Sequence, residues 1–287
     1  MTNGKSGASV RDVVAATRTD AIFAANRAVG RVELAVKTHA GVTCRARVHE
    51  AGSLRVRCPN TTSPEMEAVI LNTAGGVAGG DTFDLDIAVG EGARLVVTTA
   101  AAEKVYRTLG PDATIDVKLA VGPGAALAWL PQETILFDRA RLARSIEVEL
   151  APDARLMLAE AIVFGRSGMG ETVEEGAFTD RWRVRRAGRL IYAESVRLDG
   201  AIAAKLAEAA VAKGGLAVAT VLIVPGDDAT VAAIRALADR YLGEVGASAW
   251  NGVAAARLCA RDGAALRHDL THVMTAVRGS LPRIWTN

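Results

Sequence analysis

A short turn followed by a leucine and an apolar, β-favouring stretch recurs along this chain and constrains its fold more than any other feature. The five occurrences read AGSLRVRC, EGARLVVTT, PGAALAWLP, PDARLMLAE and AGRLIYAES, with leucines at Leu54, Leu95, Leu127, Leu156 and Leu190. By subtraction of their positions, successive leucines are 41, 32, 29 and 34 residues apart. A turn that returns at such a period predicts a mainly β, layered, β-helix-like body. The alternative is an ordinary antiparallel protein, which also needs many glycine-rich turns.

The chain divides by composition into three parts. Residues 1–20 are small and polar without a strand period, and we expect a flexible N-terminal tail. Short β-favouring stretches separated by Gly, Pro and Asp predict a β-rich layered body over residues 21–204. Residues 205–287 change character, and we expect a smaller α/β lobe packed on the body.

Two helices are expected in this C-terminal lobe. Asp227 or Asp228 can cap the first helix, over residues 229–243, and the second is expected near residues 264–277. The apolar residues of the first helix recur at helical spacing. They are Val231, Ile234, Leu237, Ala238 and Leu242.

Charge and hydropathy exclude several function classes. The chain has 34 Lys and Arg residues against 32 Asp and Glu residues, whereas nucleic-acid binding needs a concentrated basic surface. No stretch reaches the roughly 18 uninterrupted apolar residues of a membrane span. The start of the chain lacks the apolar segment of a signal peptide. We therefore expect a cytoplasmic protein that binds neither nucleic acid nor membrane.

The glycine-rich segment 72–81, NTAGGVAGGD, invites comparison with phosphate-binding loops. It lacks the Lys-Ser/Thr ending of the P-loop, and a β pattern rather than a helix follows it. Two glycine pairs instead predict backbone with positive φ or very close chain approach. Asp81 then either accepts hydrogen bonds from the turn's amides or presents its carboxylate in a groove.

A set of carboxylates lies just beyond the recurring turns. They are Glu133, Asp138, Glu160, Glu171 and Glu194. If the layers stack in register, these oxygens can line an internal channel, and oxygen ligands hold borderline divalent ions weakly. The alternative is ordinary ion pairing with the abundant arginines.

Two other groups carry alternative functions. Lys104 and Tyr106 alternate along a predicted strand and can serve dehydrogenase chemistry, although a partner-binding or internal polar role fits the absent cofactor fingerprint better. His268 and His272 share one helix face and can bind metal together with one of the scattered cysteines Cys44, Cys58 and Cys259. A small-molecule enzyme and a stable metal-binding protein are therefore two candidate functions.

Taken together, the motifs resemble the UreD (UreH) family of urease accessory proteins. Five segments carry the resemblance in order: GG-x-x-GGD (75–81), T-x-A-A-x-K-x-Y-R (99–107), WLPQETILFD (129–138), F-G-R-x-x-x-G-E (164–171) and LPRIW (281–285). The residues before 65 match loosely.

The resemblance implies a non-catalytic chaperone that takes part in nickel insertion into apo-urease (UreA, UreB and UreC). It implies a complex with UreF and the GTPase UreG, with UreE supplying nickel through UreG. It also implies a β-helix-like fold with a tunnel for Ni²⁺ in transit and no tightly bound cofactor. The candidate tunnel residues carried over by motif are Asp81, Glu133, Asp138 and Glu171. The terminal Arg283 and Trp285 either contact a partner or dock on the chain's own core.

Overall fold

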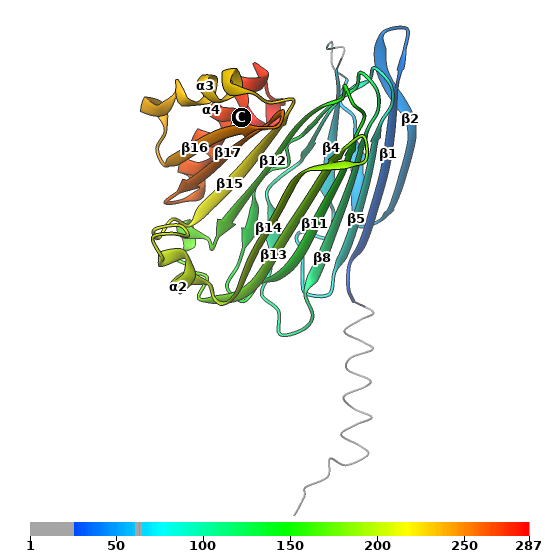
Figure 1. Ribbon diagram of the computed structural model, residues 1–287. Helices are drawn as coiled ribbons and strands as arrows, with labels where there is room; N and C mark the ends of the chain where they lie inside the picture. Colours follow the sequence, from blue (N-terminus) through cyan, green and yellow to red (C-terminus); the bar gives the residue numbers. More distant parts are fainter. Residues whose placement is uncertain (1–25, 61–62, 64, 287) are drawn as a thin grey trace, which may run out of the picture.

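The computed structural model describes residues 26–60, 63 and 65–286, and two β-sheets form most of it (Figure 1). The seven-stranded sheet has the order β14 (Arg189–Ala201), β13 (Glu175–Arg186), β11 (Arg141–Leu150), β8 (Ala113–Val121), β5 (Thr82–Val89), β1 (Val29–His39) and β2 (Val42–Gly52). The ten-stranded sheet has the order β16 (Glu244–Trp250), β17 (Val253–Ala260), β15 (Ala217–Val224), β12 (Arg155–Phe164), β9 (Ala126–Trp129), β6 (Arg94–Thr99), β4 (Met66–Asn72) and β3 (Leu54–Arg57). Two short strands, β7 (Glu103–Val105) and β10 (Thr134–Leu136), join it beside β12.

The middle of the chain winds between the two sheets as a β-helix does. From β4 to β13 the longer strands alternate between the sheets, and neighbours within each sheet run parallel. Leu95, Leu127 and Leu156 are direct register partners on β6, β9 and β12. The layered, mainly β prediction is therefore confirmed.

Two of the five repeat leucines lie outside this stack. Leu54 is on β3, which pairs antiparallel with β4, and Leu190 is on β14, which pairs antiparallel with β13. Leu190 is 47% exposed, so it does not belong to the core. A tight turn followed by leucine also marks an ordinary hairpin, and the motif alone does not separate the two cases.

The coils have two unlike ends. At one end the chain reverses tightly, and the same amide-to-carbonyl hydrogen bond closes each turn: Ala93 to Gly90 (3.1 Å), Ala125 to Gly122 (3.2 Å) and Ala154 to Ala151 (3.1 Å). At the other end long connections, residues 73–81, 100–112, 130–140 and 165–174, lead back to the seven-stranded sheet. We call this the long-loop end; it lies at the bottom of Figure 1.

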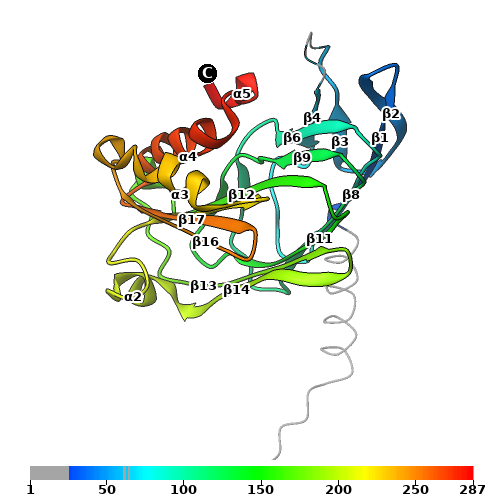
Figure 2. The ribbon, with the colours of Figure 1, turned by 45° about the horizontal axis from the view of Figure 1, so that its top comes forward.

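The helices gather toward the C-terminus. They are α2 (Ile202–Ala207), α3 (Asp228–Arg235), α4 (Gly263–Arg278) and α5 (Arg283–Thr286), with short 3-10 turns at Ser167–Met169 and Ala238–Arg240. The helices α3, α4 and α5 cover the outer face of the ten-stranded sheet (Figures 1 and 2).

The two expected C-terminal helices are present, and Asp227 caps the first by accepting from the Thr230 amide. The first helix is shorter than predicted. It ends at Arg235, and Leu242 is 62% exposed. Asp269 on α4 accepts from the backbone amides of Leu242 and Gly243 at 2.8 Å each, and these bonds turn the chain toward β16.

The C-terminal region extends the body's own sheet. Residues 217–224 of β15 pair antiparallel with β12, from Leu156 opposite Val224 to Val163 opposite Ala217. The division between a body over residues 21–204 and a lobe over residues 205–287 stays a prediction. The tail predicted over residues 1–20 lies outside the described residues.

Two apolar layers result from this arrangement. The inter-sheet layer fills the space between the sheets with residues such as Leu34, Phe83, Leu95 and Ile146. The helix layer, between the ten-stranded sheet and α3 to α5, is built from residues such as Val221, Leu266, Leu270 and Val273. One face of the ten-stranded sheet therefore serves each layer.

Candidate functional site

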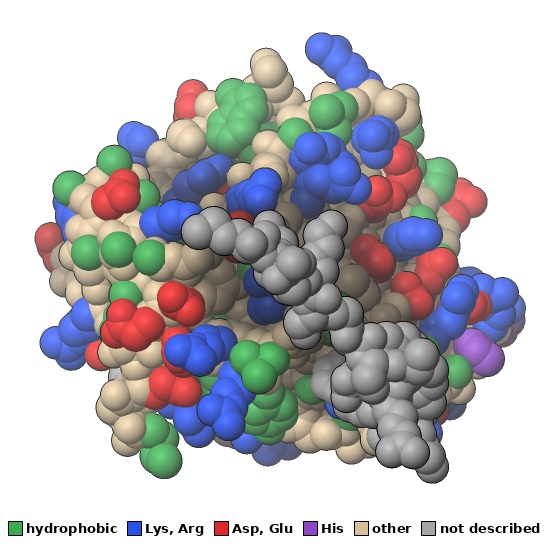
Figure 3. Space-filling view, turned by 90° about the horizontal axis from the view of Figure 1, so that it is seen from below, with side chains coloured by type: hydrophobic (Ala, Val, Ile, Leu, Met, Phe, Trp, Pro, Cys, Tyr) green, Lys and Arg blue, Asp and Glu red, His purple; other side chains and the backbone are tan. Residues whose placement is uncertain are grey.

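Two neighbouring cavities lie in the part of the inter-sheet layer that the structure describes. The loop-end cavity, of about 370 Å³, lies between strands β4, β6 and β9 of the ten-stranded sheet and strands β5 and β8 of the seven-stranded sheet. Its lining includes Ile70, Asn72, Leu85, Glu103, Ile115 and Val117. It reaches the surface at the long-loop end, where exposed Gly75 and Lys104 border it. Figure 3 looks onto this end and shows a hollowed face with cationic and acidic side chains around the hollow.

The edge cavity, of about 420 Å³, lies where β13 and β14 of one sheet diverge from β15 to β17 of the other. Its lining includes Phe178, Asp180, Trp182, Glu194, Val218 and Arg257. Among the described residues, Arg144 and Glu160 line both cavities. These two side chains therefore form the partition between the cavities.

The partition is a buried ionic cluster. Arg144 reaches from β11 across the interior, and its Nε and Nη2 donate to the two carboxylate oxygens of Asp180 on β13 at 3.1 and 2.5 Å. Its Nη1 donates to Glu160 on β12, and the indole Nε1 of Trp129 donates to the other Glu160 oxygen at 2.8 Å. Each charged side chain is at most 8% exposed.

Burial and charge oppose each other in this cluster. Burial raises the pKa of Glu160 above its ordinary range, and the neighbouring Arg144 counteracts part of that rise. Burial alone would lower the pKa of Arg144, but Asp180 and Glu160 outweigh it and raise the pKa of this guanidinium. Arg144 therefore stays a cation in direct contact with two carboxyl groups.

Glu103 places a second carboxyl group in the loop-end cavity. It lies on β7, and the amide nitrogen of Asn72 donates to both of its oxygens at 3.2 Å. Burial raises the pKa of Glu103 to about 7, against the lowering effect of Asn72. Glu103 thus gains or loses a proton near neutral pH.

A third polar group lies at the edge cavity. The Tyr192 hydroxyl donates to Glu194, and Arg257 pairs with the same carboxylate at 3.1 Å. Burial, followed by the neighbouring Glu194, raises the pKa of Tyr192 above its ordinary range. Glu194, which the sequence placed beside a recurring turn, therefore does line a cavity.

Asp81 and Asp138 hold backbone instead of facing a cavity. Asp81 accepts from the amides of Ala28 at 2.8 Å and Ala78 at 2.7 Å, as its turn-capping alternative predicted. The glycine pair before it provides positive φ at Gly80 (86°). Asp138 accepts from the amides of residues 174 and 175 at 2.9 and 3.2 Å. Both carboxylates stabilise the long-loop end.

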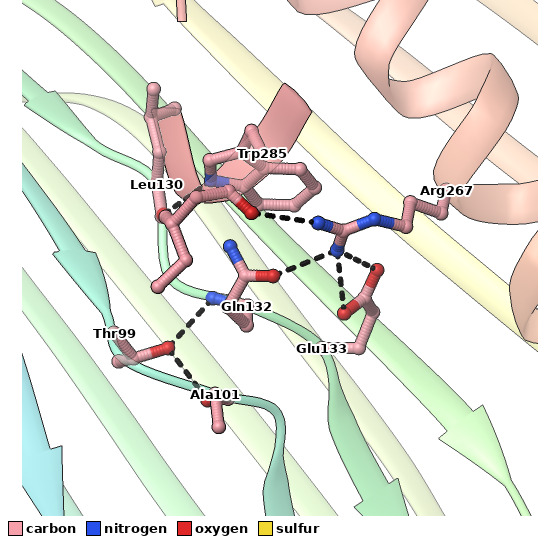
Figure 4. Close-up of polar contacts among 8 residues, drawn as sticks. Thr99, Ala101, Leu130, Gln132, Glu133, Arg267 and Trp285 are labelled. Atoms are coloured by element: carbon pink, nitrogen blue, oxygen red, sulfur yellow. Dashed lines mark hydrogen bonds and ion pairs between the residues drawn. The ribbon is translucent and has the colours of Figure 1, made fainter. Parts of the chain in front are cut away.

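Glu133 belongs to a polar anchor for the C-terminus (Figure 4). Arg267 on α4 pairs with Glu133 at 2.9 Å and donates to the side-chain carbonyl of Gln132 at 2.7 Å. The same guanidinium lies 4.7 Å from the centre of the Trp285 ring. Trp285 is 3% exposed and donates to the Leu130 carbonyl at 3.0 Å, so its indole docks on the chain's own core. Partner contact by exposed Arg283 stays a prediction.

Glu171 lies on the surface of the long-loop end. It pairs with Arg166 at 2.7 Å, and this ion pair lowers the pKa of Glu171. The Arg166 guanidinium stacks over the Phe137 ring at 4.1 Å, and the Tyr106 ring meets Phe137 edge-on at 5.2 Å. Asp81, Glu133, Asp138 and Glu171 are all absent from the described lining of the two cavities. Their role as transient nickel ligands stays a prediction.

The residues behind the alternative functions are dispersed. Lys104 and Tyr106 are both exposed beside buried Val105, and the Tyr106 hydroxyl donates to the Gly75 carbonyl at 2.8 Å. The rings of His268 and His272 lie 4.3 Å apart on exposed helix surface. Within the described ranges, no group of three or more His, Cys, Asp or Glu residues is placed to hold a metal ion.

The sequence of the whole chain matches a known family. The sequence profile of the UreD urease accessory protein family matches residues 28–286.

The chain belongs to the UreD urease accessory protein family.

Individual relatives agree with this match. A UreD urease accessory protein of Rhodopseudomonas palustris strain BisB5 is 56% identical over 94% of this chain and 96% of the relative. A UreD urease accessory protein from strain BisB18 is 58% identical over 94% of this chain and 98% of the relative. A UreD urease accessory protein from Bradyrhizobium diazoefficiens is 55% identical over 94% of this chain and 98% of the relative. The chain is thus an accessory protein involved in urease maturation, as the sequence motifs predicted.

The UreD motifs map mainly to one end of the molecule. Four of the five recognised segments lie in or beside the connections of the long-loop end. Sequence reasoning on motifs missed Arg144, Asp180 and Glu103, although a signal for Arg144 exists. Leu142, Arg144 and Ile146 alternate on β11 and all point inward, so an arginine stands where the strand pattern requires an apolar residue. No helix within the described residues is both long and apolar enough to cross a bilayer.

Proposed function

We propose that this UreD-family chain is both a scaffold and a nickel conduit between a UreF/UreG complex and apo-urease. In this proposal nickel passes through the inter-sheet layer, from one cavity to the other. UreG hydrolyses GTP, UreE delivers nickel to UreG, and the subunits UreA, UreB and UreC receive it. The cytoplasmic location expected from the sequence stays a prediction.

The main support for the conduit is a pair of neighbouring cavities with one shared wall, formed by Arg144 and Glu160. The loop-end cavity borders exposed residues of the long loops, and the edge cavity borders exposed residues of β16 and β17 such as Glu244 and Arg257. Cavities in line between two surfaces are rare in a close-packed interior. A cargo the size of a hydrated metal ion fits either volume.

The polar groups of this interior suit an ion in transit. Carboxylate oxygens of Glu103, Glu160 and Glu194 lie along the two cavities, where sulfur and imidazole ligands are sparse. Oxygen ligands hold borderline divalent ions loosely, whereas thiolate and imidazole hold them tightly. In this proposal nickel is a cargo in transit and not a resident cofactor.

The carboxylates predicted from motifs enter this proposal differently. Asp81 and Asp138 shape the loops that surround the first cavity, and Glu171 lies on the surface beside Arg166. Each would have to leave its present partners to bind nickel. We propose that they support the conduit or its docking surface, with the ion itself carried by the cavity groups.

The conduit can be tested by filling a cavity. Ile115 lies on β8 and lines the loop-end cavity, so Ile115→Trp should obstruct it. Val42 is 55% exposed on β2 and lines neither cavity, so Val42→Trp is the matched control. Each variant is co-produced with urease and the other accessory proteins, and the nickel content and activity of purified urease are measured.

We expect Ile115→Trp to leave urease protein present but poor in nickel, while Val42→Trp activates it normally. Pull-down with UreF should be the same for both variants, which separates obstruction from lost assembly. Normal nickel content with Ile115→Trp would refute the conduit. Failure of the unsubstituted chain to capture UreF would refute the proposed partnership.

A further inference from the structure

A cluster of charged side chains separates the loop-end cavity from the edge cavity. Arg144 crosses the space between the sheets and contacts one carboxyl group from each of them. Asp180 is its direct register partner on β13, and Glu160 lies on β12 of the opposite sheet. An ion that travels from one cavity to the other must therefore pass this guanidinium.

A guanidinium in that position opposes a cation. Like charges a few ångströms apart in a low-dielectric interior repel strongly. Arg144 and Trp129 together bond all four carboxylate oxygens: Asp180 accepts from Arg144 with both oxygens, and Glu160 accepts from Arg144 with one and from Trp129 with the other. In the observed arrangement a metal ion must therefore compete with Arg144 for these carboxylates.

The cluster carries one cation against two carboxyl groups. A buried ionic group of this kind contributes little to stability, because the desolvation cost offsets the attraction. An apolar core needs no such cluster, and the other buried side chains of the inter-sheet layer are largely apolar. Its position between two cavities therefore points to a functional role.

We propose that Arg144 is a gate in the conduit, which a divalent cation opens by taking over the oxygens of Glu160 and Asp180. This inference rests on the proposed function. The incoming ion, with two charges, replaces a guanidinium with one, and Arg144 moves into the cavity space on either side. A monovalent ion has no such advantage over the guanidinium. The gate thus favours divalent cargo and keeps the passage closed when no cargo is present.

The site would hold the divalent ion that replaces Arg144 only weakly. Only two carboxyl groups are supplied, and Arg144 competes for both. Within the described residues no third acid, histidine or cysteine joins them. An ion in this position can therefore leave toward the second cavity when Arg144 returns.

Removing the competitor should convert the gate into a binding site. The full-length chain and its Arg144→Gln variant are titrated with NiCl2 by calorimetry, and with KCl as the monovalent control. We expect the variant to bind one nickel ion about tenfold more tightly than the unsubstituted chain, because a competing charge has been removed. The double variant Arg144→Gln/Asp180→Asn should lose this gain, and KCl should show none.

Equal nickel affinity of the unsubstituted chain and the Arg144→Gln variant would overturn the gate. A gain that persists in the double variant would overturn it as well, since the ion would then bind elsewhere. Arg144→Lys keeps the charge but cannot form the fork to Asp180, so it should give a smaller gain and serves if Arg144→Gln does not fold. The cavity-filling test is independent: reduced urease nickel with Ile115→Trp, together with no gain in Arg144→Gln, would retain the conduit and reject the gate.

Discussion

The two faces of the ten-stranded sheet are packed in opposite ways. Its outer face meets α3 to α5 through small residues, many of them alanines such as Ala159, Ala219 and Ala256, which let the helices approach closely. Its inner face borders two cavities and the buried charges of Arg144 and Glu160. In the helix layer Asp269 is buried, but its oxygens accept from two backbone amides.

If the proposed conduit is right, the helix layer mainly stabilises the fold and the inter-sheet layer carries the function. A dense apolar layer gains the most from burial and dispersion. Cavities and buried charges reduce that gain, and such features are typical of functional sites. We therefore expect substitutions in the helix layer to affect stability and those in the inter-sheet layer to affect nickel delivery.

The largest expected effect compares two leucines. Leu266 on α4 is fully buried in the helix layer, whereas Leu85 on β5 lines the loop-end cavity. Leu266→Ala should lower the free energy of unfolding by about 4 kcal/mol, because it leaves a new cavity in a dense layer. Leu85→Ala should cost about 2 kcal/mol, because that side chain already borders empty space. Urea denaturation of both variants measures the difference. Equal losses of unfolding free energy would contradict the expectation that the helix layer is packed more densely than the inter-sheet layer.

A smaller effect concerns the ionisable group of the inter-sheet layer. The pKa of Glu103 is about 7 in the folded chain, against an ordinary value of 4.5. Because the folded state keeps this proton longer, stability falls as pH rises between these two values. Glu103→Gln removes that loss, so the variant should be more stable than the unsubstituted chain by about 2 kcal/mol at about pH 8, and nearly equal below pH ~5.

The control for this pH effect is exposed Glu91, on the tight turn after β5. Urea denaturation of Glu91→Gln across the same pH range should differ from the unsubstituted chain by less than about 0.5 kcal/mol. A Glu103→Gln variant that gains no stability at high pH would contradict the burial-raised pKa. The buried carboxylate of Glu103 would then not reduce the stability of the inter-sheet layer.

The smallest expected effect concerns the edge of the helix layer. Trp285→Phe retains the aromatic packing but removes the N–H that bonds the Leu130 carbonyl. The expected loss is about 1 kcal/mol, the net value of one buried hydrogen bond. Thermal unfolding checks it, with pull-down of UreF as the second readout. Unchanged stability together with lost UreF binding would mean that the indole leaves the core to meet a partner.

Much of the fold could be predicted because its signals are local. The β-favouring stretches, the recurring turns and the capped C-terminal helices are each set by residues close together in the sequence. The hydrogen bond from the Ala78 amide to Asp81 spans three positions and was foreseen as an alternative. The hairpins of Leu54 and Leu190 were not separated from the coils, since a turn followed by leucine occurs in both.

The site was harder to predict because its residues are joined across coils. Arg144 meets Asp180 across 36 positions and Glu160 across 16. Those distances in sequence become contacts only once each long loop has fixed the register of the next coil. The motif carboxylates were visible in the sequence, but the partners of Asp138 and Glu133 lie far along the chain, at the amide of Glu174 and the guanidinium of Arg267.

The layered β architecture, the two late helices and membership in the UreD family could all be predicted from the sequence alone. Strand period, turn chemistry and helix capping act over a few residues, and family motifs are read directly from the chain. The inward docking of Trp285 and the place of Arg144 between two cavities, by contrast, became visible only in the folded chain. Burial and pairing of a charged side chain depend on which coil lies above and below it, and that is a property of the assembled stack.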